Sequence, residues 1–173
     1  MTPTRATTPR ATALGLTLLA VLASSACASP APPAAPAAAE GQAPKTPGEQ
    51  CLATARAQRA RGANEPAKVS VRHVLVKYKG AKNPVAGVTR TREEACLRAM
   101  EARDKARGGA DFAELVSAYS DEPGAASHQG SLGSVERREL APPFADAAFE
   151  LGPRELSDVV ETESGFHLIF RYE

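Results

Sequence analysis

A change of composition near residue 48 limits what this chain can fold into. Residues 28–48 are almost entirely alanine and proline with a few polar residues, and none has a large apolar side chain. Such a stretch cannot bury a core and tends to be extended and semi-stiff. The core must therefore come from roughly the last hundred residues, which is enough for one small domain. We expect residues 27–48 to be a disordered tether, although an inert tail would fit the same composition.

The first 26 residues have the layout of an export signal. Arg5 and Arg10 precede an apolar stretch over 11–23, and small residues lead to Cys27. The apolar stretch is shorter than the ~20 residues that cross a bilayer. Residues 1–26 resemble a bacterial lipoprotein signal, which implies cleavage before Cys27 and lipidation of that cysteine. Ordinary signal cleavage after Ala28 is the alternative. We expect an exported protein of the periplasm or cell envelope, anchored to a membrane by its lipid.

Two further cysteines lie where helices are predicted. Residues 49–67 form a short helical segment, because 49–61 are rich in helix formers and Gly62 follows. This segment carries Cys51, and Cys96 lies in a second predicted helix. If Cys27 is lipidated, an oxidising compartment would allow Cys51 and Cys96 to pair. Two separate buried thiols are the alternative.

Charge and motif content exclude several function classes. The formal net charge is +1 with 24% charged residues, which argues against a nucleic-acid binder, because such proteins concentrate positive charge. The chain has neither a phosphate-binding glycine loop nor a cysteine-rich zinc pattern, and its three histidines lack metal-ligand spacing. We expect no metal and no cofactor.

The remaining sequence alternates between strand and helix patterns. Thr91-Arg-Glu-Glu94 is a capping box, and Gly108-Gly109 would end the helix that it starts. Asp111 begins another helix whose buried side carries Phe112, Leu115, Val116 and Tyr119. Strands are expected over 69–78, 132–135, 156–160 and 166–172, with a brief helix over 144–149. This order predicts an α+β domain on a small sheet.

Several motifs in this domain occur in the order found in one family. Residues 69–173 resemble the parvulin-type peptidyl-prolyl isomerases in the stretches 72–77, 89–95, 111–115, 119–121, 130–133, 143–149 and 163–169. The resemblance implies a four-stranded antiparallel sheet surrounded by about four helices. It also implies catalysis of rotation about X-Pro bonds, with proline-containing polypeptides as partners.

The resemblance assigns roles position by position. His73 and His167 match the paired central histidines, Thr162 and Ser164 match hydroxyls beside them, and Glu122 stands where the family usually has Cys or Asp. Leu140 and Phe144 match the residues that hold the proline ring. Lys77 and Lys82 lie in the loop where phosphate-directed members carry arginines, and they would bind an acidic residue before proline; a solvated lysine loop is the alternative. Ser131 replaces a usual aspartate.

The chemistry explains why such residues would be assembled. Rotation about an X-Pro bond must overcome the loss of amide resonance, but no bond is broken. The catalyst therefore needs an apolar slot for the ring and a site that favours the twisted amide. We expect a monomeric isomerase that assists the folding of exported or envelope proteins. The alternative is a non-catalytic, chaperone-like peptide-binding module of the same fold.

Overall fold

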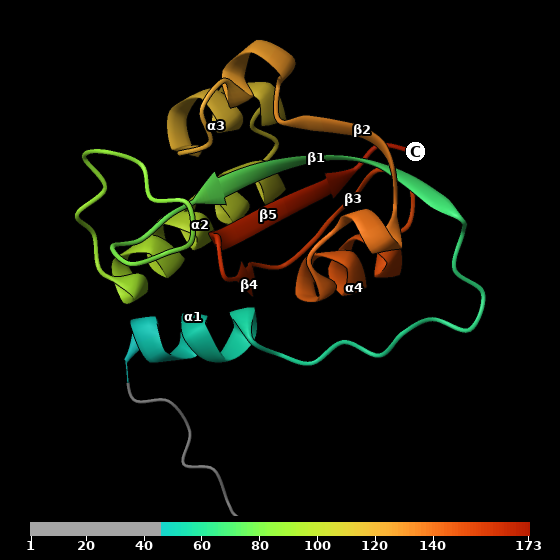
Figure 1. Ribbon diagram of the computed structural model, residues 1–173, viewed down its shortest axis with the longest axis horizontal. Helices are drawn as coiled ribbons and strands as arrows, with labels where there is room; N and C mark the ends of the chain where they lie inside the picture. The colour runs from blue at the N-terminus through green and yellow to red at the C-terminus, as the bar shows by residue number, and fades with distance from the viewer. Residues whose placement is uncertain (1–45) are drawn as a thin grey trace, which may run out of the picture. The chain divides into compact units, whose positions relative to one another are not determined.

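The computed structural model describes residues 46–173, which form an α+β domain (Figure 1). The predicted export signal, Cys27 and the tether up to residue 45 lie outside the described residues. The elements in chain order are α1 (Pro47–Ala55), β1 (Lys68–Val76), α2 (Arg92–Arg107), α3 (Phe112–Tyr119), β2 (Ser131–Glu136), α4 (Pro142–Glu150), β3 (Glu155–Leu156), β4 (Val160–Thr162) and β5 (Gly165–Arg171), with short 3-10 turns at Ala125–His128 and Arg137–Glu139. In this described part, no helix is long and apolar enough to cross a membrane.

The sheet is antiparallel and has β1 and β5 at its centre. Its order is β2-β1-β5-β3, and β4 also pairs with β5. Because β3 and β4 pair with opposite ends of β5, they share one edge of the sheet. The expected strand over 156–160 is interrupted: its first residue belongs to β3 and its last to β4. Between them, the Ser157 hydroxyl, rather than a backbone carbonyl, accepts the Ile169 amide (2.9 Å). The expected antiparallel sheet and four surrounding helices are confirmed, and the sheet of the described residues has five strands at four positions because β3 and β4 share one edge.

The ends of α2 and α3 are determined by neighbouring residues. The Thr91 hydroxyl accepts the Glu94 amide, and the Glu94 carboxylate accepts the Thr91 amide, which completes the predicted capping box. The Asp111 carboxylate caps α3 by accepting the amides of Ala113 and Glu114. The expected apolar side of α3, Phe112, Leu115, Val116 and Tyr119, is buried. These helices therefore form where the sequence predicts them.

The first helix is shorter than the sequence predicts. It begins at Pro47, inside the stretch assigned to the tether, because Thr46 and Glu49 form a capping box around a proline in the first turn. It ends at Ala55 rather than near Arg61. A short helix depends on packing for its stability, and the residues after Ala55 offer mainly exposed side chains. Residues 56–67 instead run beneath α4 to the start of β1 (Figure 1).

The two faces of the sheet pack against different helices. One core joins α1, α2 and α3 to Val74, Val76, Phe166 and Leu168. The second joins α4 to side chains such as Val71 and Ile169 on the opposite face. Side chains alternate between the faces of a strand, so His73, two residues from Val71, and His167, two residues from Ile169, both lie on the α4 side.

A disulfide joins the first helix to the second. Cys51 of α1 and Cys96 of α2 are bonded, with 6.0 Å between their Cα atoms. Both residues are buried in the first core. Of the two alternatives left open by the sequence, the structure has the bonded pair.

Candidate active site

The structure brings the two histidines together on neighbouring strands. His73 of β1 and His167 of β5 lie diagonally across the ladder, since His167 pairs with Leu75 and His73 with Ile169. Their Nδ1 atoms are 3.2 Å apart and their rings are nearly parallel. Both side chains are buried. Because the pair is buried, each ring nitrogen needs a partner.

Further polar groups extend the histidine pair at both ends. The Thr162 hydroxyl lies 2.8 Å from His167 Nε2 and accepts the Ser164 amide at 3.1 Å. At the other end, Glu122 Oε2 is 2.9 Å from His73 Nε2, a close polar contact without the alignment of a linear hydrogen bond. We call these four side chains, Glu122, His73, His167 and Thr162, the histidine chain.

The groups at the two ends indicate one direction of hydrogen bonding when both rings are neutral. The Ser164 amide can only donate, and the Glu122 carboxylate can only accept. Thr162 then donates its hydroxyl proton to His167 Nε2, and His167 Nδ1–H donates to His73 Nδ1. His73 keeps its proton on Nε2, facing Glu122. This assignment follows from the network, because proton positions are not observed.

Glu122 is positioned by the residue before it. The Asp121 amide donates to the Leu75 carbonyl at 2.7 Å, and the Asp121 carboxylate accepts the Lys77 amide at 2.8 Å. That carboxylate also pairs with Arg90. The loop after α3 is thus attached to β1, the strand that carries His73. The motif Tyr119-Ser-Asp121 signalled this loop in the sequence, but the anchoring roles of Asp121 and Arg90 were not predicted.

The surroundings determine which groups carry charge. Contact with His73 lowers the pKa of Glu122, against the opposing effect of burial. Burial lowers the pKa of His167 well below its usual range, and the neighbouring His73 and Lys77 lower it further. At neutral pH the histidine chain therefore contains an ionised Glu122 and a neutral His167.

The low pKa of His167 should make the protein less stable in acid. Below about pH 6.5 the unfolded chain binds a proton at this histidine that the folded protein does not bind, so the free energy of unfolding should fall as pH drops. One such proton changes this free energy by up to about 1.4 kcal/mol per pH unit. Urea unfolding from pH 7.5 to 5.0 should show a shallower decline for His167→Gln than for the wild type.

The same substitution at an exposed histidine, His128→Gln, is the matched control for the change of side chain. If His167→Gln and the wild type decline in parallel, the folded protein must protonate His167 as readily as the unfolded chain.

An apolar slot adjoins the histidine chain. Phe144 of α4 directs its ring edge-on to both histidines, with ring centroids 5.6 Å from His73 and 5.1 Å from His167. Leu140 and Leu132 are partly buried in the same cluster. The slot thus contains the two residues expected from the sequence and Leu132, which was not singled out although it lies within the Gly-Ser-Leu-Gly motif.

The start of β2 approaches His73 closely. The His73 amide donates to the Gly130 carbonyl at 2.8 Å. Gly130 has a positive φ of 69°, and a Cβ at this position would overlap the His73 carbonyl oxygen, so glycine is required. The next residue, Ser131, accepts the Gly133 amide at 3.2 Å and thereby provides a local hydrogen bond where the family usually has a carboxylate.

Three residues expected in the site have different surroundings. Lys77 is buried, and its ammonium donates to the carbonyls of Lys82 (3.1 Å) and Ser164 (3.4 Å), so it is not free to bind substrate. Lys82 is exposed but pairs with Glu163 at 3.1 Å. Ser164 contributes its backbone to the network, and its hydroxyl makes no hydrogen bond within the described residues. The expectation that Lys77 binds substrate is wrong, because the loop folds back over this side chain.

Comparisons with known proteins concern the same part of the chain. The family model for the PPIC-type PPIase domain, or rotamase, matches residues 73–172. Putative peptidyl-prolyl cis-trans isomerase dodo of Drosophila melanogaster is 40% identical over 115 residues, which cover 64% of this chain and 69% of that protein. Chaperone SurA of Methylococcus capsulatus is 34% identical over 125 residues, which cover 72% of this chain but 26% of SurA.

Solved structures have the same fold. The peptidyl-prolyl isomerase ESS1 from Candida albicans superposes with a TM-score of 0.56 at 31% identity, covering 64% of this chain and 65% of that chain. Among residues 46–173, no three His, Cys, Asp or Glu side chains gather in a metal-binding arrangement.

Proposed function

The chain belongs to the parvulin family of PPIC-type peptidyl-prolyl cis/trans isomerases, and we propose that it isomerises X-Pro bonds of exported or cell-envelope proteins and so assists their folding. The observation that carries this proposal is the histidine chain beside the apolar slot: Glu122, His73, His167 and Thr162 connect in one network, and Phe144 contacts both rings.

In this proposal, the slot selects proline and lowers the polarity around the bond. The pyrrolidine ring would pack against Phe144, Leu140 and Leu132. The planar amide carries partial negative charge on its oxygen because of resonance, and twisting the bond removes part of that charge. Exclusion of water therefore destabilises the planar forms more than the twisted one, which lowers the barrier.

The carboxylate of Glu122 would act in the same direction. Its side chain is 32% exposed, so it can face a bound peptide while it remains paired with His73. Its negative charge would repel the carbonyl oxygen of a planar amide more than that of a twisted amide. The histidine chain would hold the carboxylate in place, and no proton would need to move.

Two observations support a role outside the cytoplasm. The disulfide between Cys51 and Cys96 is of a type that persists in oxidising compartments. The first 26 residues have the layout of an export signal that ends at Cys27. Because this layout ends at Cys27, we propose a lipid anchor at that cysteine. The similarity to a protein named as a chaperone is consistent with assistance to folding.

An isomerisation assay on short peptides tests the proposal. The purified protein should accelerate isomerisation of Leu-Pro and Glu-Pro peptides, and a His73→Ala, His167→Ala double variant should lose most of this acceleration. Rates for the two peptides should differ by less than about fivefold, because exposed charge pairs contribute at most about 1 kcal/mol and Lys82 already pairs with Glu163.

Circular dichroism must show that the double variant remains folded. A wild-type rate equal to the uncatalysed rate would contradict the isomerase function. Peptide binding without acceleration would instead indicate a chaperone-like module that holds proline-containing segments.

A further inference from the structure

A pocket lies between the N-terminal segment and the start of α4. Its volume is about 660 Å³, and it follows the edge strand β4. Residues from four regions line it: the end of α1 and the segment after it (55–59), Tyr78 and Arg92, the start of α4 (Pro142, Pro143 and Asp146), and the end of β4 with the next residue (161–163).

This pocket adjoins the candidate active site at Thr162. Thr162 lines the pocket and also lies 2.8 Å from His167 in the histidine chain. Pro142 and Pro143 line it as well, and they immediately precede Phe144 of the apolar slot. A polypeptide with its proline in the slot would therefore have this pocket directly beside it.

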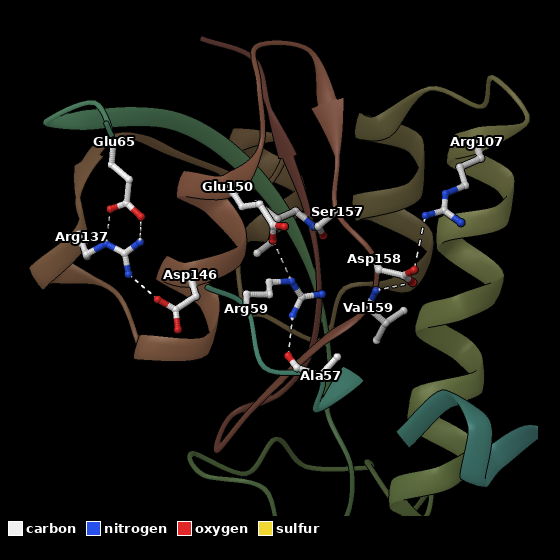
Figure 2. A network of polar contacts seen from close by, with 11 residues as sticks. Ala57, Arg59, Glu65, Arg107, Arg137, Asp146, Glu150, Ser157, Asp158 and Val159 are labelled. Atoms are coloured by element: carbon white, nitrogen blue, oxygen red, sulfur yellow. Dashed lines mark hydrogen bonds and ion pairs between the residues drawn. The ribbon is translucent and has the colours of Figure 1, made fainter. Parts of the chain in front are cut away.

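One wall of the pocket comes from outside the part that matches the family model. The family match covers residues 73–172, whereas residues 55–59 precede it. The disulfide fixes α1 to α2, and Arg56 pairs with Glu161 of β4 at 3.0 Å. Arg59 pairs with Glu150 at the end of α4, as Figure 2 shows. The wall is thus attached to the domain on both sides of the pocket.

A second contact holds the chain farther along. Glu65 binds Arg137 through both carboxylate oxygens, at 2.9 and 2.6 Å, and Arg137 also pairs with Asp146 of α4 (Figure 2). This two-oxygen contact has the geometry of a specific guanidinium–carboxylate pair. Residues 56–67 are therefore held along α4 at both ends.

The lining offers little free charge. Each of its six charged side chains has an oppositely charged partner: Arg56, Arg59, Arg92, Asp146, Glu161 and Glu163. Ala57, Pro142 and Pro143 expose apolar surface, and Gln58 provides an exposed amide that has no hydrogen-bond partner in the described part of the chain. Such a surface suits an uncharged peptide that is extended along it.

We propose that this pocket is a substrate subsite, which binds an extended, uncharged stretch with apolar side chains next to the X-Pro bond. The subsite rests on the proposed isomerase function, and it adds a preference for longer, uncharged substrates. Residues 55–59 would supply this preference, because they form one wall of the pocket. They precede residues 73–172, the part of the chain that the family model matches.

Peptide length and one pair of variants test the subsite. A four-residue X-Pro peptide is compared with two longer peptides, one extended at its N-terminus and the other at its C-terminus by five uncharged residues, some apolar and some polar. One of the two longer peptides should have a KM about 10-fold lower than that of the short peptide, corresponding to about 1.4 kcal/mol. Ala57→Trp, which fills the pocket from its exposed wall, should abolish this gain and leave kcat/KM for the short peptide unchanged.

Ala60→Trp is the matched control, because Ala60 is exposed on the same segment but does not line the pocket. It should keep the gain from peptide length. The subsite is wrong if neither lengthened peptide has a lower KM, if both variants behave alike, or if flanking Lys or Asp residues strengthen binding.

Direct binding of labelled peptides, measured by fluorescence anisotropy, separates this proposal from the isomerase function. Suppose that the protein shows no isomerase activity but binds the longer peptide more tightly than the short one, and that only Ala57→Trp removes the difference. This result would support the subsite and contradict the isomerase function. Isomerase activity without any effect of peptide length would support the isomerase function and contradict the subsite.

Discussion

Replacing Glu122 by glutamine should lower kcat for X-Pro isomerisation by about 100-fold, the size of effect expected when one preorganised electrostatic group is removed. Glutamine has nearly the same shape, and its amide oxygen can take the place of the carboxylate oxygen that lies 2.9 Å from His73 Nε2. The substitution therefore removes the charge and largely preserves the contact. KM should change little, because the carboxylate is proposed to act on the planar-to-twisted difference rather than on binding.

The comparison with Glu122→Ala separates charge from positioning. If Glu122 only holds His73 in place, glutamine should retain most of the activity and alanine should lose it. If the charge is what matters, both variants should be slow. Glu114→Gln is the matched control, because Glu114 is exposed on α3 and away from the histidine chain. The activity is measured at pH 7.5, where the lowered pKa of Glu122 keeps the wild-type carboxylate ionised.

Removal of the disulfide should lower the free energy of unfolding by about 4 kcal/mol, according to the chain-entropy relation for a loop of this length. The bond joins residues that are 45 positions apart, so its loss returns considerable freedom to the unfolded chain. Both sulfurs are buried in the core between α1 and α2. The measurement is urea unfolding of the wild type and of a Cys51→Ala, Cys96→Ala double variant, both above pH 7.

Reductant provides the internal control for this experiment. It should destabilise the wild type and leave the double variant unchanged, since only the wild type has the bond to lose. Equal stability of the oxidised wild type and the double variant would contradict the prediction, because it would mean that the bond does not stabilise the folded state relative to the unfolded chain.

A helix end can be predicted from the sequence when the residues that determine it are close together in the chain. The caps of α2 and α3 were predicted correctly, because Thr91 with Glu94, and Asp111 with the amides after it, lie within one helical turn. The end of α1 was not, since helix formers continue to Arg61 in the sequence. A short helix depends on tertiary packing, and the side chains after Ala55 are mainly exposed in the fold, which the local sequence does not show.

Side-chain environments were harder to predict than secondary structure. Lys77 lies near the end of the strand predicted over 69–78, next to a polar loop, which in sequence resembles an exposed position. In the fold, its ammonium is enclosed by carbonyls from Lys82 and from Ser164, which lies 87 positions away. Leu132 was overlooked for a similar reason, because its place beside Phe144 depends on how β2 and α4 pack.

By itself, the sequence determined the family, the α+β class and the histidine pair, because motif order, strand alternation and helix caps are written in neighbouring residues. Only the tertiary structure decided that Cys51 and Cys96 pair, that Glu122 contacts His73, that Lys77 is buried, and that residues 55–59 form a wall beside Thr162. These features depend on distances between segments far apart in the chain, and such distances arise only when the two faces of the sheet are packed.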